Sequence, residues 1–412
     1  MIRRCLKAGG KESVDLGMPG AVPGQRVSSH NLAHFLPSPV SEAPSDTPGR
    51  YGCAVGFLKG LFGRESALAQ GGEGQTDPSP GWDAITKACE RVYPGQSDPL
   101  HFDMLVPAFL DDGNPLHGIS VYRAAGPRPH WHYVTYGLTD LFGQQEGSGD
   151  NGVSGWGFEL TFRLADDEAM KARQAPTWPL NMLQYLAGYV ARTGNGFAPN
   201  HHLDANGPIV PGEETTQTAL GFIEDPDLGS IETSSGTIQF VQLVGLTQED
   251  LEDANNWDAG RLFALLVKAY PKGVTVLRRA SLRADPQAAS QILEGRKKDG
   301  SQMGQVFIDV LHVAAEDNVA VVGIGARTAG FLGERLNNRL PHGREFLLHS
   351  PDAELLFLPG DRTGVQVGQA EATLTLDPAD LSRLAATLKA QAGHYMAPEG
   401  VVWQVERTEI TD

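Results

Sequence analysis

The residues with the clearest capacity for chemistry are four histidines in two pairs. His130 and His132 are two positions apart, so they share one face if they lie in a strand, and His201 and His202 are adjacent. Neutral imidazoles bind zinc and other transition metals. One hypothesis is therefore a metal-dependent hydrolase that uses His130, His132, His201 and His202. However, adjacent histidines diverge on most backbones, and no H-E-x-x-H pattern accompanies them. We therefore expect no bound metal.

The segment VAVVGIGARTAG, residues 319–330, has the strand–glycine–helix form of a dinucleotide-binding turn. Its glycines do not have the G-x-G-x-x-G spacing that admits a pyrophosphate, and the segment comes late in the chain. It predicts a plain strand–turn–helix, and we expect no cofactor.

Nucleophilic and acid–base catalysis receive little support. Ser154 is not in a G-x-S-x-G elbow, and Cys89 falls on the apolar face of a predicted helix, where core packing is expected. Asp140, Glu159 and Asp166 could form an acid–base pair, but carboxylates near strand ends are more often simply solvated. The sequence therefore predicts a protein without a catalytic set.

Composition limits the possible partners and compartments. The 412 residues carry a formal net charge of -17, which disfavours nucleic acid and anionic membranes and favours capture of a basic partner. No apolar run reaches the length of a membrane span. Cys5, Cys53 and Cys89 are too widely spaced for a disulfide framework or a zinc knuckle, so a reducing, cytoplasmic setting is expected.

The elements expected in the first two thirds of the chain favour an α+β fold. Residues 1–80 are rich in Gly, Pro and Ser and are expected to be disordered, and an alternative start at Val55 would leave 1–54 untranslated. Order begins with a helix at Ser79-Pro80. Strand-like runs alternate with a few helices, which is typical of α+β domains. The expected strands are 118–123, 132–137, 156–164, 219–224 and 237–244, the third half-buried, and a helix starts at Thr177.

A second domain is expected after a linker. The stretch EGRKKDGSQMG, residues 294–304, is charged and glycine-bearing, so it separates a first domain at 81–293 from a second at 305–412. Each domain should contain a mixed or antiparallel sheet with packed helices. In the second, strands are expected at 306–313, 319–324 and 401–405, and helices at 328–338 and after Asp377-Pro378.

Residues 82–272 resemble the N-terminal domain of the Suppressor of fused family. The resemblance is carried by ACERVYPGQSDP, HWHYVTYGLTDLFG, GWGFELTFRL and APTWPLNMLQYLAGYV, which follow one another in the expected order. In the C-terminal half, LNNRLPHGREF at 336–346 resembles the family's L-x-x-R-L-x-H-G-R-x-F segment. A mainly structural role is expected for the motif residues His130, Trp131, His132, Tyr133, Asp140, Phe158 and Glu159.

The resemblance implies two α+β domains on a flexible linker. In animal members these close on a short extended peptide of Gli transcription factors, which pairs with strands of both domains. Bacterial members are commonly immunity-type proteins near polymorphic toxin systems. We therefore expect a non-catalytic, inhibitory clamp that binds a protein or peptide by strand addition.

The resemblance implies a few positions of the family's peptide-binding groove in this chain. Tyr189 matches a tyrosine that lines the groove, and Val306 matches a groove-facing valine at the start of the second domain. His201 stands where the family has an acidic residue, and Asp204 could supply that carboxylate if the loop is shifted. For Tyr189, core packing beside the neighbouring apolar residues of its helix is an equally open alternative.

Overall fold

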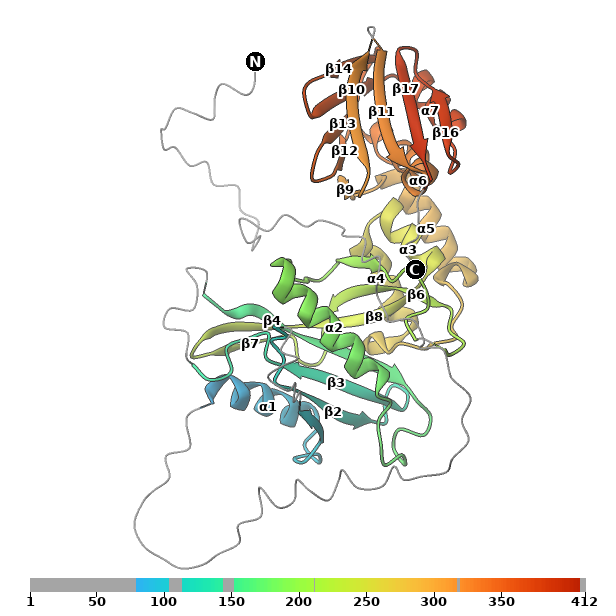
Figure 1. The fold of residues 1–412 in the computed structure, drawn as a ribbon. Helices are drawn as coiled ribbons and strands as arrows, with labels where there is room; N and C mark the ends of the chain where they lie inside the picture. The colour runs from blue at the N-terminus through green and yellow to red at the C-terminus, as the bar shows by residue number, and fades with distance from the viewer. Residues whose placement is uncertain (1–78, 104–112, 144–151, 211, 317–318, 408–412) are drawn as a thin grey trace, which may run out of the picture.

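The computed structural model describes residues 79–103, 113–143, 152–210, 212–316 and 319–407, and the expectations for residues 1–78 lie outside these ranges. Two bodies follow one another along the chain (Figure 1). The first contains one large sheet with helices, and the second contains two smaller sheets with two helices. The α+β class expected from the sequence is confirmed.

The first domain is built on an eight-stranded sheet with the order β1-β2-β3-β4-β8-β6-β5, and β7 also pairs with β8. Only the central β4–β8 pair is parallel. The strands are β1 Leu100–Asp103, β2 Gly118–Ala124, β3 His130–Tyr136, β4 Val153–Ala165, β5 His202–Asp204, β6 Gln217–Glu224, β7 Ser230–Thr233 and β8 Gly236–Thr247.

Helices cover both faces of this sheet (Figure 1). Helix α2, Trp178–Thr193, packs on one face, and α1, Pro80–Val92, packs on the other, each over its own apolar cluster. Consequently β4 is buried on both faces from Phe158 to Leu164, including Glu159 and Arg163. The prediction of a half-buried strand was wrong, because the polar positions of β4 lie beneath α1 rather than in water.

Three further helices lie beside β6 and β8: α3 Gln248–Asn256, α4 Ala259–Ala269 and α5 Pro286–Asp299. The side chain of Asp285 accepts hydrogen bonds from the amides of Gln287 and Ala288 and so caps α5. Residues 294–299, assigned to the linker from their charge, form the last part of α5, because the buried Ile292 holds that helix against the first domain.

The remaining connection, residues 300–304, is held by hydrogen bonds. The carbonyl of Ser301 accepts from Arg339 Nη1 at 2.8 Å and from Arg344 Nη1 at 3.1 Å. The Ser301 amide donates to the carbonyl of Asn338 at 2.6 Å. Both arginines belong to the LNNRLPHGREF motif, so this motif fixes the junction between the domains.

The second domain packs two sheets face to face around one apolar core. The rings of Phe357 and Trp403, one from each sheet, stack with their centroids 6.4 Å apart. The predicted strand–turn–helix at 319–330 is confirmed, since β11 leads directly into α6. One sheet has the order β10-β11-β17-β16, formed by β10 Leu311–Glu316, β11 Val319–Gly325, β17 Val401–Glu406 and β16 Gly393–Met396. The other has the order β14-β15-β13-β12-β9, formed by β14 Gly364–Val367, β15 Glu371–Leu376, β13 Glu354–Pro359, β12 Phe346–His349 and β9 Gln305–Phe307. The helices of this domain are α6 Ala326–Asn337 and α7 Pro378–Thr387.

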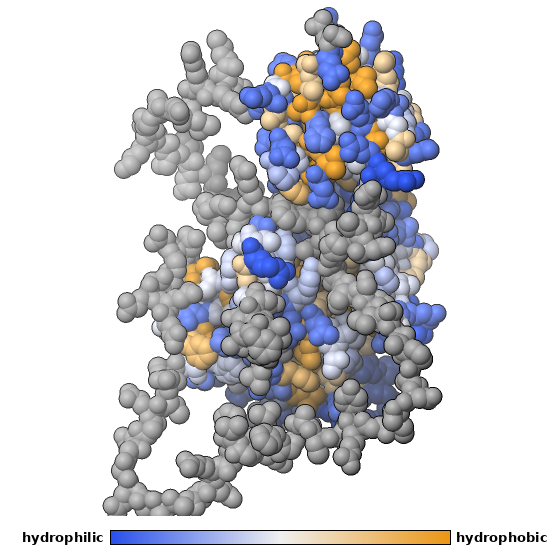
Figure 2. Space-filling view, viewed as in Figure 1, coloured by the Kyte–Doolittle hydropathy of each residue, from blue (hydrophilic) through white to orange (hydrophobic). Residues whose placement is uncertain are grey.

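Apolar residues also gather on the visible face of the second domain, over β10, β11 and β17 (Figure 2). Ala314, Val321, Val402 and Met396 are cross-strand neighbours in this row, and Met396 is 66% exposed.

Within the described ranges, no helix combines the length and the apolar character needed to cross a bilayer.

Gly300→Ala should destabilise the junction. Gly300 has φ 63° and ψ −176°, a conformation that suits glycine almost alone, and an added Cβ would lie 2.3 Å from Cδ2 of His342. We expect the free energy of unfolding to fall by about 1–3 kcal/mol in urea titrations. Gly95→Ala is the matched control, since no atom lies within 4 Å of its added Cβ. Equal stability of the two variants would contradict the role given to Gly300.

Candidate functional site

The four histidines of the hydrolase hypothesis do not come together. His130 and His132 lie on β3, whereas His201 and His202 lie at β5, with β4, β8 and β6 between them. Four strand spacings correspond to roughly 19 Å. In the described part of the chain, no group of three or more histidine, cysteine or acidic side chains is placed to hold a metal ion. The four-histidine site is therefore contradicted by the geometry.

Both histidines of β3 are buried and neutral. Burial lowers the pKa of His130 to about 4, and its Nδ1 donates to the carbonyl of Arg128 at 2.7 Å. Burial likewise lowers the pKa of His132 to about 4, and its Nδ1 lies 2.8 Å from the hydroxyl of Tyr93. The motif residues Trp131 and Tyr133 between them are fully buried as well.

The remaining motif residues are enclosed in the first domain. The carboxylate of Glu159 is fully buried and accepts four hydrogen bonds, from the amides of Gly137 and Thr139 and from the hydroxyls of Thr135 and Thr139. Burial raises the pKa of Glu159, and these hydrogen bonds oppose the rise. Asp140 accepts from the amides at the turn that follows it, and Phe158 packs under α2. None of these groups faces solvent as a general acid or base would need to.

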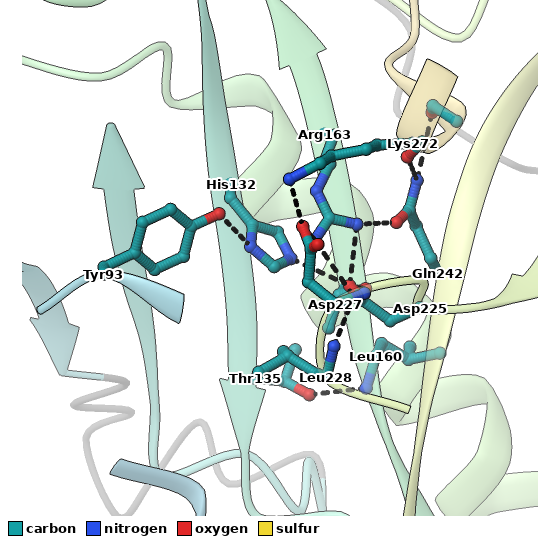
Figure 3. Close-up of polar contacts among 12 residues, drawn as sticks. Tyr93, His132, Thr135, Leu160, Arg163, Asp225, Asp227, Leu228, Gln242 and Lys272 are labelled. Carbon is teal, nitrogen blue, oxygen red and sulfur yellow. Dashed lines mark hydrogen bonds and ion pairs between the residues drawn. The ribbon is translucent and has the colours of Figure 1, made fainter. Parts of the chain in front are cut away.

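A buried ionic network lies between β3, β4 and β8 (Figure 3). Arg163 is fully buried and binds Asp225 through two contacts, Nη1 to Oδ2 at 2.9 Å and Nη2 to Oδ1 at 3.0 Å. Asp227 accepts from both Arg163 and Lys272. His132 Nε2 lies 3.0 Å from Asp225 Oδ2. Burial alone would raise the pKa of Asp225, but His132 and Arg163 hold it well below its usual range, so Asp225 is anionic.

The network was not predicted from the sequence, although a signal was present. Glu159, Thr161 and Arg163 alternate with large apolar residues in β4, which is also the pattern of a strand with one face in water. Only the position of α1 distinguishes a buried β4 from one with a face in water.

An open depression of about 300 Å³ lies beside this network, lined among others by Tyr93, Arg123 and Lys272. The Arg163–Asp225 pair at the centre of the network is fully buried, whereas Lys272 and Asp227 at its edge are partly exposed and paired with each other.

A second feature is the edge of the first sheet at β5. The carbonyl of His201 and the amide of Ala205 bond to β6, and Leu203 pairs with Leu220 of β6. Because backbone groups alternate in direction along a strand, the N–H and C=O groups of His202 and Asp204 point away from β6. Among the described strands, none pairs with β5 on that side.

Tyr189 of α2 packs in the core beside β6, the strand that pairs with β5. It is 7% exposed, and its ring stacks on Phe197, which in turn stacks on Phe222 of β6 at centroid distances of 5.7 and 4.5 Å. Phe222 exchanges backbone hydrogen bonds with the chain entering β5. Tyr189 therefore supports β5 through two aromatic rings, and its side chain belongs to the apolar core beneath α2.

The other predicted groove residues are split between the domains. Burial lowers the pKa of His201, and its Nδ1 accepts from the amide of Ala198 at 3.2 Å. Asp204 crosses the junction, since its carboxylate binds Nη2 of Arg327 on α6 at 2.6 Å. Val306 lies in β9, the terminal strand of its sheet, and packs against the second core. β5 and β9 are thus the end strands of sheets in two different domains.

Comparison with known proteins gives consistent matches. Residues 112–280 match the family described as Suppressor of fused protein (SUFU). The Suppressor of fused homologs of Homo sapiens and Mus musculus are each 35% identical over 240 residues, which cover 55% of this chain and 49% of theirs. The chain thus spans about half the length of the curated relatives it matches. The crystal structure of Drosophila Suppressor of Fused has a TM-score of 0.65 at 23% identity, covering 81% of this chain and 98% of that one, which shows a shared fold.

Asp225→Asn should strongly destabilise the protein. The substitution leaves the fully buried Arg163 without its full counter-charge, a type of change that costs about 3–5 kcal/mol. Chemical unfolding at pH 7 measures the loss. The double variant Asp225→Leu with Arg163→Met removes both charges and should lose less. A larger loss in the double variant would contradict the assignment of the cost to an unpaired charge.

Stability should also fall in mild acid because of His130. The folded state keeps His130 neutral down to about pH 4, whereas the unfolded chain protonates it near pH 6.5. The unfolded state therefore binds more protons in this window, and stability present above pH 6.5 decreases as the pH falls towards 4, by up to about 1.4 kcal/mol per unit. His132 and His202, whose pKa values burial also lowers to about 4, contribute to the same slope, so His130→Gln should reduce the slope in urea titrations without abolishing it, and His394→Gln, at an exposed site, should leave it unchanged. An unchanged slope in His130→Gln would refute the explanation.

Proposed function

Because this chain belongs, through residues 112–280, to the Suppressor of fused family, we propose that it works by binding another protein rather than by catalysis. The binding mode is capture of an extended partner segment, which adds as a strand to β5 and is held against the second domain. The observation that carries this proposal is the outward direction of the backbone groups of His202 and Asp204 at the end of the sheet.

The physical basis is the pairing capacity of a sheet edge. Main-chain hydrogen bonds supply affinity in strand addition, and side-chain contacts supply specificity. Native proteins usually blunt such edges with charges, bulges or short strands. β5 has only three residues and follows Asn200, a non-glycine residue with φ 73°. An added strand would therefore pair with β5 over only a few residues and would need further contacts from the second domain.

The four residues expected in the groove have distinct roles in this proposal. Tyr189 holds β5 in place through Phe197, and His201 and Asp204 flank the pairing backbone. Val306 belongs to the first strand after the junction, so β9 moves with the second domain. Asp204 is bound to Arg327 in the absence of a partner. Both side chains of this ion pair are partly exposed, so it contributes at most about 1 kcal/mol and a partner can displace it.

We further propose that binding inhibits the partner, as an immunity protein inhibits its toxin. A net charge of -17 accelerates encounter with a basic target, such as a nuclease-like toxin. The captured segment would lose its own function while it is paired with β5. Co-expression with a basic toxin encoded beside the gene would test this role by survival of the host.

Asp204→Pro tests strand addition directly. Proline removes the outward N–H, and an edge position tolerates it because that group makes no bond within the sheet. Random nine-residue peptides displayed on yeast and enriched on the wild-type chain should bind this variant at least tenfold more weakly. Asp204→Ala loses the Arg327 contact but keeps the N–H, so it should retain most binding. Equal binding by Asp204→Pro and Asp204→Ala would contradict pairing at this edge.

The neighbouring position gives a control for folding. Leu203 pairs with β6 and is 9% exposed, so Leu203→Pro removes an inward hydrogen bond and should lower the thermal midpoint strongly. Asp204→Pro should unfold close to wild type. If both variants unfold alike, the assignment of inward and outward groups in β5 is wrong.

A further inference from the structure

Helix α6 has a stripe of three side chains along one side. Arg327, Phe331 and Arg335 are spaced i, i+4 and i+8, so they lie on one side of the helix. Arg327 crosses the junction to Asp204 and to the side chain of Asn206. The first residue of the stripe therefore binds β5, whereas Phe331 packs against the core of the second domain.

Arg335 has an unusual environment within this stripe. It is only 8% exposed, and its Nη1 is buried without any hydrogen-bond acceptor. Its guanidinium lies 5.7 Å from the ring centre of Phe331, and among the described residues it forms no ion pair. By contrast, the buried Arg163 and Arg279 each bind a carboxylate, the latter Asp250 at 2.7 Å.

The charge of Arg335 is retained, although no carboxylate among the described residues binds it directly. Burial lowers its pKa to about 10, so the guanidinium is still protonated at neutral pH. Glu334 on the same helix and Glu252 on α3 favour the charge from a distance, but neither forms an ion pair with Arg335, and Glu334 is bound to Arg296. Burying a cation without a partner is costly, and such groups normally have a counter-charge.

Arg335 also lies near β5. After burial itself, its positive charge and that of His201 are the causes that lower the pKa of His202, whose Nε2 contacts Asn255 of α3 at 3.0 Å. His202 is one of the two residues with outward backbone groups. Helix α3 packs against both β5 and α6, and α6 also reaches β5 through Arg327, so a side chain of a strand added to β5 would enter the junction in which Arg335 lies.

We propose that Arg335 is a specificity residue that binds the carboxylate of an Asp or Glu side chain in the partner segment paired with β5. This inference rests on the proposed function. The guanidinium fork binds a carboxylate through two parallel hydrogen bonds, which selects both the residue type and the register of the added strand. The ring of Phe331 beneath the guanidinium holds it in one orientation.

The local site and the overall charge make different demands on the partner. The net charge of -17 repels an acidic protein, so the carboxylate belongs to a segment of a partner that is basic elsewhere. The long-range field then governs encounter, while the single acidic residue sets the alignment once the segment is paired.

The test is a selection of random nine-residue peptides, displayed on yeast, on the full chain. The wild type should enrich Asp or Glu at one fixed position about tenfold over its input frequency. Arg335→Glu should reverse the preference at that position to Lys or Arg, and Arg335→Met should remove it. Arg383→Met is the matched control, since Arg383 is an exposed arginine of α7 in the same domain, and it should keep the wild-type preference.

The outcomes separate the two proposals. Enriched peptides that depend on the Asp204 amide but show no acidic preference would overturn the carboxylate site and leave strand addition standing. An acidic preference that persists in Arg335→Glu, or one that requires only a free peptide C-terminus, would also overturn it. No enrichment on any variant would overturn both proposals.

Thermal unfolding gives an independent readout without peptide. Arg335→Met replaces a buried unpaired cation by an apolar side chain of similar length, so the thermal midpoint should stay equal or rise. A clear fall in the midpoint, with Arg383→Met unchanged, would show that Arg335 serves the fold and would overturn its assignment as a recognition residue.

Discussion

The first domain depends on the ion pair between Arg163 and Asp225. This pair allows Arg163 of the central strand β4 to be buried beneath α1, because Asp225 supplies its counter-charge inside the protein. Asp225 also accepts from the amide of Leu228 and so orders the turn after β6. Since β6 pairs with β5, the turn that Asp225 orders follows the strand next to the sheet edge. A buried ion pair adds little stability over apolar packing, but its geometry is demanding, and geometry is what an edge strand requires.

The junction between the domains is organised by one short segment and one helix. The carbonyl of Ser301 is held by two arginines, and α6 reaches back to the first domain with Arg327 and Arg335. These two arginines differ in a useful way. Arg327 has a weak, exposed partner in the chain itself, whereas Arg335 is buried without one. A partner could displace the exposed ion pair of Arg327 and supply a carboxylate to Arg335. Both properties agree with the proposed binding of a second molecule at this junction.

The sequence predicts the α+β class and the strand–turn–helix at 319–330, because apolar periodicity and family motifs carry that information. It fails where tertiary packing decides. The polar positions of β4 alternate as on a wetted strand, and only α1 shows that they are buried. The charged end of α5 looks like a linker, because a helix held by Ile292 needs few apolar residues. Arg335 has no sequence signal at all, since a buried cation without a bound carboxylate is recognised only from the three-dimensional structure.

The hydrogen bond between Ser301 and Asn338 places the end of α6 beside the connecting segment, so any rotation of the second domain about this segment would carry α6 with it. Along the helix axis Arg335 is about 5 Å from Asn338 and Arg327 about 16 Å, from the rise of 1.5 Å per residue. A 10° rotation about the connecting segment, across the helix, would move Arg327 by about 3 Å but Arg335 by less than about 1 Å. Opening would therefore release Asp204 while the carboxylate-binding end stayed almost still. A partner segment could therefore bind Arg335 first, and the domains could then close on the rest of the segment.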